Sequence, residues 1–339
     1  MRALVGASSV DSVVRVTGNF ASENPIHPAA REALLAAFDQ GWADPKKISQ
    51  SASKAAILRN QALENIAAQL GISASTIEVL GEPSLGHFLS IAGLFSDRSP
   101  FAYSSIDKGK IRAIARSHNA DVIELPVTHD GEILETATVP TQSVLSLQLA
   151  NGETGAINRL PQSLPGDLLV AVDATASGNR VPLPENWSSA VFDSRSWEGP
   201  AGLAIVAISD AANWKNPLPH ISAVRRTYGT FSLPLLIASA VALENFAPDE
   251  QNIRKLSAKL RAEISQKIPT ALVAGDLDRS LPHLTSFIFP GCNGEELLRA
   301  LSVRGLSVDS GSACTAMNLQ PSHVLAAMGL PTDGNIRIT

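Results

Sequence analysis

Between about residue 28 and residue 210, the chain alternates helical stretches with short apolar runs rich in Val, Ile and Leu. Parallel strands that are covered on both faces have such continuous apolar runs, and helices connect them. The alternation therefore predicts right-handed βαβ crossovers and an α/β fold with a single doubly wound, mostly parallel sheet. We expect its strands at residues 76–80, 101–106, 121–127, 143–150, 167–174 and 202–209.

Two helices are predicted inside this region. Residues 49–71 repeat apolar side chains at helical spacing and end in Gly71, a residue that commonly stops a helix. A second helical pattern covers residues 108–120, between two of the expected strands.

A second unit follows the long helical pattern that begins near residue 233. It is expected to contain helices at 252–268 and 294–305 and a strand at 284–290. We therefore predict a large α/β domain of residues 13–245 and a small C-terminal α+β domain of residues 246–339, on which residues 1–12 pack.

Composition excludes several classes of function. The net charge of −5, without a run of Lys or Arg, gives no surface for a nucleic-acid backbone. No segment reaches the roughly 20 apolar residues of a membrane span, and the N-terminus lacks a signal sequence, so we expect a cytoplasmic protein. Two cysteines form neither a disulfide framework nor a zinc motif, and the seven scattered histidines predict no metal site.

The most specific motif is VRGLSVDSGSACTAMNLQPSHVLAAMGL, residues 303–330. It resembles the active-cysteine loop and following helix of the cysteine desulfurases, which belong to the pyridoxal-phosphate (PLP) proteins of fold type I. A Cys among Ser and Gly residues suits a thiolate that must reach a pocket and hand sulfur to an acceptor. The resemblance makes Cys314 the persulfide carrier; the alternative is a buried structural cysteine.

Further family landmarks run in order from about residue 13 to the end of the chain. They are NGETGAI (151–157), VDATASG (172–178), YGTFSLPLLIA (228–238) and NIRIT (335–339). The resemblance implies a large domain with a mostly parallel sheet of the seven-stranded type and a smaller α+β domain.

The same landmarks imply binding roles. Asp173 would pair with the ring nitrogen of PLP, and Arg337 and Asn151 would contact the substrate, Arg337 through its carboxylate. Thr230 would reach the cofactor phosphate across a subunit interface, which implies a homodimer with composite sites. Structural alternatives stay open: Asp173 as a helix cap, Arg337 in a surface ion pair, and Thr230 in a turn.

The pattern breaks at the lysine that holds the cofactor in this family. The corresponding stretch, FDSRSWEGPAG (192–202), contains no lysine. Ser196 stands at the lysine position, Arg195 at that of a His, and Asp193 at that of a phosphate-binding Ser. PLP is thus implied by resemblance, but not through a covalent link to this position.

Other parts of the cofactor pocket differ as well. LGEPSL (80–85) replaces the phosphate-binding loop and keeps only one hydroxyl, that of Ser84. Glu82 and Asp193 would face the phosphate, and like charges at that distance disfavour binding. Lys108 stands where a ring-stacking His is expected. Gly152 replaces an Asn and Ala176 a Gln.

Three hypotheses follow, and they leave open whether the chain is an enzyme. The leading one is a degenerate desulfurase-like protein that relays sulfur through Cys314 or serves as partner of a true desulfurase. The alternative is an active desulfurase that binds PLP without a covalent link and converts cysteine to alanine and a Cys314 persulfide. The third is a remodelled pocket for another ligand, lined by Arg195, Lys108 and Glu82.

Overall fold

The computed structural model describes residues 18–21, 25–40, 43–45, 47–96, 98–135, 138–209, 211, 213–219, 231–311 and 321–339. Cys314 and Thr230 lie outside the described residues. The helices are α1 Pro28–Asp39, α2 Gln50–Leu70, α3 Pro83–Ala92, α4 Gly109–Ser117, α5 Leu233–Asn245, α6 Glu250–Lys267, α7 Gly294–Val303 and α8 His323–Ala327, with 3-10 turns η1 Ala74–Thr76 and η2 Ser194–Trp197. The strands are β1 Asn19–Phe20, β2 Ile77–Leu80, β3 Phe101–Ser104, β4 Val122–Leu125, β5 Val144–Gln148, β6 Leu169–Asp173, β7 Trp187–Asp193, β8 Ala204–Ile208, β9 Leu272–Ala274, β10 Thr285–Ile288, β11 Ser307–Val308 and β12 Asn335–Ile338.

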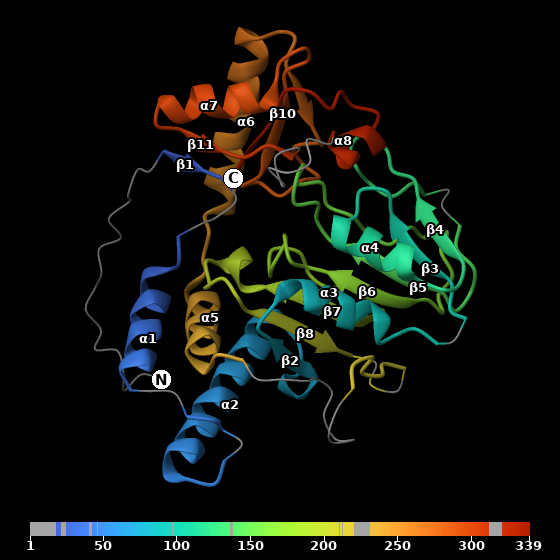
Figure 1. The fold of residues 1–339 in the computed structure, drawn as a ribbon. Helices are drawn as coiled ribbons and strands as arrows, with labels where there is room; N and C mark the ends of the chain where they lie inside the picture. The colour runs from blue at the N-terminus through green and yellow to red at the C-terminus, as the bar shows by residue number, and fades with distance from the viewer. Residues whose placement is uncertain are drawn as a thin grey trace.

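A seven-stranded sheet of order β2-β8-β7-β6-β5-β3-β4 forms the centre of the molecule (Figure 1). The strands from β4 to β7 run parallel, whereas β8 is antiparallel to both β7 and β2. The predicted α/β class and mostly parallel sheet are confirmed. All six expected strands are present, each one to three residues shorter at its ends than predicted.

Strand β7 was not predicted, because WSSAVFD has no continuous apolar run. Its serines are nevertheless buried. Ser189 Oγ donates to the carbonyl of Ser90 (2.7 Å) and lies 2.9 Å from Ser90 Oγ on helix α3. A buried hydroxyl that is hydrogen-bonded in this way carries little penalty, so polar residues can occupy a central strand.

Each face of the sheet carries its own apolar core, because alternate strand residues point to opposite sides. Helices α3 and α4 cover one face, and helices α2 and α5 cover the other. The first core contains Leu89, Ile111, Phe101, Val144, Ala171 and Val206, and the second contains Ile66, Leu236, Ala102, Leu145, Val172 and Ile205.

Helix α2 confirms the helix predicted at residues 49–71. Ser49 caps its first turn, with Oγ accepting from Ala52 N at 3.1 Å. Gly71 ends it in the left-handed region, at φ 67°. The helices predicted at 108–120, 252–268 and 294–305 correspond to α4, α6 and α7.

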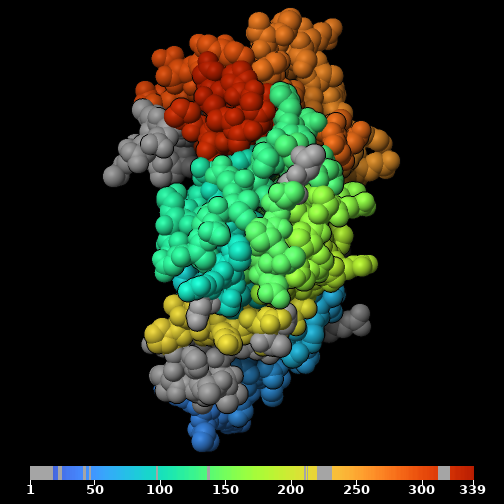
Figure 2. Space-filling model, turned by 90° about the vertical axis from the view of Figure 1, so that its right-hand side faces the viewer, coloured from blue at the N-terminus to red at the C-terminus, as the bar shows by residue number. Residues whose placement is uncertain are grey.

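The C-terminal residues form a second sheet, in which β9, β10 and β12 pair antiparallel. Figure 2 shows these residues, in orange and red, gathered at one end of the molecule above the green middle of the chain. Strand β1 pairs in parallel with β11, so residues 19–20 join this unit although the predicted large domain includes them. The domain boundary at 245/246 stays a prediction; α5 ends at Asn245 and α6 begins at Glu250.

Among the described helices, none combines the length and the apolar character that crossing a bilayer requires.

Candidate functional site

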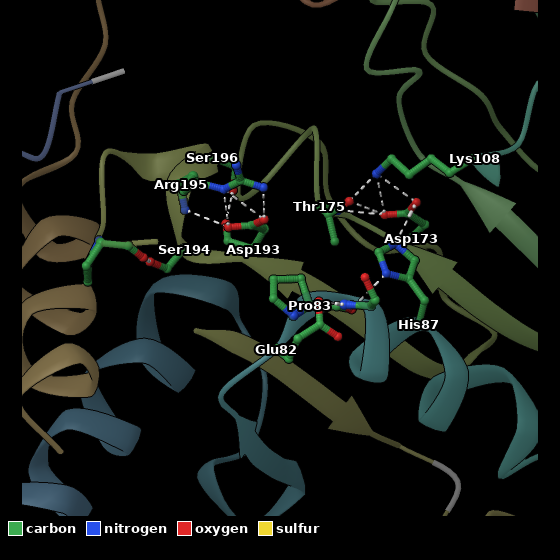
Figure 3. Close-up of polar contacts among 12 residues, drawn as sticks. Glu82, Pro83, His87, Lys108, Asp173, Thr175, Asp193, Ser194, Arg195 and Ser196 are labelled. Atoms are coloured by element: carbon green, nitrogen blue, oxygen red, sulfur yellow. Dashed lines mark hydrogen bonds and ion pairs between the residues drawn. The ribbon is translucent and has the colours of Figure 1, made fainter. Parts of the chain in front are cut away.

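Asp173 is the last residue of β6, a central strand of the large sheet. Its side chain is only 2% exposed, yet it lies within ion-pair distance of two basic groups (Figure 3). Lys108 Nζ is 2.9 Å from Oδ2 and 3.2 Å from Oδ1, and His87 Nε2 is 3.1 Å from Oδ2. Thr175 donates its hydroxyl (2.6 Å) and its backbone N–H (2.9 Å) to Oδ1. The carboxylate is therefore surrounded by donors from the chain itself.

These contacts decide the charge of Asp173. Burial alone would raise its pKa, but the positive charges of Lys108 and His87 and the hydrogen bonds of His87 and Thr175 outweigh burial and hold the pKa well below its ordinary value. The residues after β6 form turns, not a helix, so the helix-cap alternative for Asp173 is wrong.

The two basic groups come from separate elements. Lys108 precedes the first residue of α4, and 29% of its side chain is exposed. His87 lies one turn into α3, where Nδ1 is 2.9 Å from the carbonyl of Pro83. Both ring nitrogens thus lie close to oxygen atoms. The sequence prediction missed His87 because residues 80–85 were interpreted as a loop; Pro83, a common first residue of helices, was the available signal.

Asp107 is a second carboxyl group at this end of the sheet and is fully buried. Oδ2 accepts from Ser104 N (3.1 Å), whereas Oδ1 has no hydrogen-bond partner among the described residues. Burial, together with the nearby negative charge of Asp173, raises the pKa of Asp107 to about 8. Asp107 is therefore mostly protonated near neutral pH, while Asp173 is ionised.

The stretch that should hold the lysine follows strand β7. Asp193 ends the strand, accepts from Arg195 N (3.0 Å) and pairs with the Arg195 guanidinium at 2.7 Å. Ser196 donates its hydroxyl to the carbonyl of Asp193 (2.7 Å), and Gly178 packs directly against it. The position that the resemblance assigns to lysine therefore holds a hydroxyl that is already bound to the backbone (Figure 3).

Glu82 occupies the amino end of α3, where the resemblance places the cofactor phosphate. Its carboxylate accepts from Ser84 N (2.8 Å) and Leu85 N (2.6 Å). The small burial of Glu82 would raise its pKa, but these backbone bonds and the Ser84 hydroxyl bring a net lowering. The N–H groups at a helix start are a natural anion site, and here a carboxylate of the chain fills it.

Arg337 lies on β12 and is bound on two sides. One terminal nitrogen is 2.7 Å from Asp309 Oδ2, and the other donates to the carbonyl of Gly152 at 2.8 Å. Asn151 is 2% exposed, and its side chain bonds Gln148, the carbonyl of Ile106 and the N–H groups of its own turn. Substrate contact by Arg337 and Asn151 stays a prediction. The alternative of an ion pair at Arg337 is present, with Asp309, although the Arg337 side chain is only 12% exposed.

Glu153 joins the two residues that flank the Cys314 segment. Oε1 accepts from Ser322 Oγ at 2.6 Å, and the carboxylate packs so closely on Gly311 that a Cβ at residue 311 would require Glu153 to move. Burial raises the pKa of Glu153 against the lowering effects of Ser322, Arg337 and His323. Cys292, the other thiol, is exposed in the turn after β10.

The three places that the resemblance assigns to the ring nitrogen, the carbonyl carbon and the phosphate of PLP are thus filled by side chains of the chain. Lys108 pairs with Asp173, Ser196 replaces the amine, and Glu82 caps the helix amides. This arrangement does not fit PLP. The N–H of Ser84 donates to Glu82, and phosphate binding by the Ser84 hydroxyl stays a prediction.

A family model described as aminotransferase class-V matches residues 109–339, more than half of the chain. Among curated relatives, a cysteine desulfurase of Sinorhizobium fredii is 28% identical over 242 residues, which cover 64% of this chain and 60% of the relative. The cysteine desulfurase IscS of Clostridium botulinum is 25% identical over 92% of this chain and 86% of its own length. A cysteine desulfurase of Nostoc is 25% identical over 97% of this chain and 88% of its own length.

Solved structures agree with this likeness in fold. A NifS-like protein superposes with a TM-score of 0.80 at 22% identity, covering 95% of this chain and 93% of its own. SspA in complex with cysteine superposes with a TM-score of 0.77 at 23% identity, covering 95% of this chain and 98% of its own. At these identities the two structures establish the PLP fold type I architecture.

Proposed function

Because the chain belongs to the aminotransferase class-V family and is cysteine-desulfurase-like in sequence and fold, we propose that it relays sulfur through Cys314 without PLP turnover of its own. The observation that carries the proposal is Ser196. Its hydroxyl is bound to the carbonyl of Asp193 at the place where the family chemistry uses a lysine amine. An amine is needed there both to hold the cofactor and to move the substrate proton, and a hydroxyl that donates to the backbone does neither.

The sulfur donor is a persulfide on a competent desulfurase. The Cys314 thiolate attacks the outer sulfur of that persulfide, a new S–S bond forms on Cys314, and the S–S bond of the donor breaks. The donor cysteine leaves as a thiolate and takes up a proton from solvent, as Cys314 earlier released one. The exchange needs no oxidant or reductant, because one persulfide replaces another.

A homodimer in the cytoplasm is the proposed state. Support comes from large apolar side chains that stay exposed on helices α1 and α2, since exposed apolar surface can mark an interface between subunits. Leu35 and Phe38 on α1 and Ile57 on α2 are 48%, 56% and 58% exposed. Both helices pack against α5.

Sulfur transfer tests the proposal directly. A catalytic desulfurase is charged with ³⁵S-cysteine and mixed with this protein, and the label that remains on this protein after separation is counted. We expect labelling of the wild type and of Cys292→Ser, and loss of the label in Cys314→Ser. Cys292→Ser is the matched control, because it removes an exposed thiol from a turn.

A second assay separates the relay from an active enzyme. The purified protein is incubated with PLP and cysteine alone, and released alanine is measured. We expect none above background. Alanine production that Cys314→Ser abolishes would overturn the relay and establish the desulfurase that binds PLP without a covalent link. In the labelling assay, equal labelling of wild type and Cys314→Ser would place the sulfur on another residue and overturn the relay through Cys314. A wild type that takes up no label would leave the protein a scaffold.

A further inference from the structure

Asp173 lies beside a positive charge of the chain, at the place where the resemblance puts the protonated ring of PLP. The pyridine nitrogen that the resemblance places against Asp173 is protonated when bound. In this structure the Lys108 ammonium lies 2.9 Å from Oδ2 and also contacts the Thr175 hydroxyl. The charge that Asp173 requires is therefore supplied by the chain.

At the position assigned to the cofactor phosphate, the chain likewise supplies the charge itself, and here the charge is negative. A phosphate would bring negative charge to the amino end of α3. Glu82 brings a carboxylate to those amides, with its two oxygens 2.8 Å from Ser84 N and 2.6 Å from Leu85 N. A phosphate cannot accept from the same two N–H groups while Glu82 holds them.

Arg337, which the resemblance assigns to the substrate, is also paired with a side chain of the chain. The resemblance assigns the carboxylate of an amino acid to Arg337, whose side chain is only 12% exposed. Asp309 places its own carboxylate 2.7 Å from that guanidinium. A buried cation without such a partner would be unfavourable, so Asp309 stabilises Arg337 in the absence of substrate.

We propose that Lys108, Glu82 and Asp309 act as built-in replacements for the cofactor ring, the cofactor phosphate and the substrate carboxylate. Each replacement has the sign of charge of the group it replaces and contacts the residue or helix end assigned to that group. Each of the three positions is thus balanced in charge without a ligand, and the fold is stable without PLP. The inference is independent of whether Cys314 accepts sulfur.

PLP binding tests the replacement. Equilibrium dialysis against PLP, read by absorbance, is compared between wild type and the variant Lys108→Met/Glu82→Ser. Removing two replacements exposes Asp173 and the helix amides, so we expect PLP to bind at least about tenfold more tightly than to wild type, which corresponds to about 1.4 kcal/mol. Adding PLP to wild type should leave its Tm unchanged.

A matched control removes the same residue types elsewhere. Lys259 and Glu263 form an exposed pair on α6, at 3.8 Å. Lys259→Met/Glu263→Ser should bind PLP no better than wild type. Binding by wild type as tight as that of Lys108→Met/Glu82→Ser, or equal gains in both double variants, would overturn the proposal.

If Lys108→Met/Glu82→Ser folds poorly, a double-mutant cycle of Lys108 and Asp173, measured by thermal unfolding, tests the proposal instead. Lys108→Met removes the ammonium partner of Asp173 and should lower Tm by on the order of 5 °C. Adding Asp173→Asn removes the unpaired charge and should recover part of that loss. A Lys108→Met protein with unchanged Tm, or a double variant whose losses simply add, would show that Lys108 does not replace a ligand. Sulfur labelling of Cys314 is read separately, so either proposal can fail alone.

Discussion

Asp173 and Asp193 end neighbouring parallel strands, and the two side chains are similarly buried, at 2% and 6% exposure. Their partners differ. Asp173 is held by Lys108 and His87, which come from separate helices, whereas Asp193 pairs with Arg195, only two residues along the chain and 49% exposed. The first network joins elements that are distant in sequence, and the second is a local turn in contact with solvent. Two similar carboxylates at the same end of the sheet therefore contribute to stability in different ways.

Removing Asp173 should have the largest effect on stability. Asp173→Ala leaves buried His87 without its acceptor and Thr175 without its turn partner, so we expect a loss of about 3 kcal/mol in the free energy of unfolding. Asp193→Ala, which removes a local cap, should cost about 1 kcal/mol. Urea unfolding at pH 7 measures both. Equal losses would show that the network of Asp173 is no stronger than the local turn.

Asp107 makes the stability of this end of the sheet depend on pH. Its pKa of about 8 in the folded protein exceeds the ordinary 3.8, so the folded state keeps a proton that the unfolded state loses between these values. Its contribution to stability is therefore full below about pH 4 and is lost as pH rises towards 8. Asp173, whose pKa is lowered, contributes in the opposite sense: its stabilisation is present above about pH 4 and is lost in acid.

Asp107→Asn removes the titrating group while keeping its shape. We expect the variant to gain on the order of 2 kcal/mol of stability relative to wild type as pH increases from 6 to 8. Thermal unfolding across this pH range measures the difference. A difference that stays constant with pH would mean that Asp107 is already ionised in the folded protein.

Much of the fold could be predicted from the sequence because buried parallel strands have continuous apolar runs. Strand β7 could not be predicted in this way because Ser188 and Ser189 interrupt its apolar run. Their buried hydroxyls form hydrogen bonds to residues that are distant in sequence. Helix α3 is missing from the prediction because residues 80–85 resemble a changed phosphate-binding loop. In the structure Glu82 caps the helix and Pro83 is its first residue.

The site was harder to predict than the fold. Asp173, Lys108 and Glu82 could each be singled out by position. The contacts among them could not, since Lys108 and His87 reach Asp173 only when the sheet order places the starts of α4 and α3 beside the end of β6. The missing lysine was visible in the sequence, whereas the ammonium that pairs with Asp173 was visible only in three dimensions.

The smallest expected effect is at Arg195. Arg195→Ala removes the ion pair with Asp193, but half of the Arg195 side chain is in water, where such pairs contribute little. The backbone bond from residue 195 to Asp193 survives the substitution, so the turn keeps its cap. We expect a loss of about 0.5 kcal/mol or less in urea unfolding, and smaller still at high salt. A loss as large as that of Asp173→Ala would mean that the end of β7 is held by a network like that of β6, and that the two strand ends do not differ.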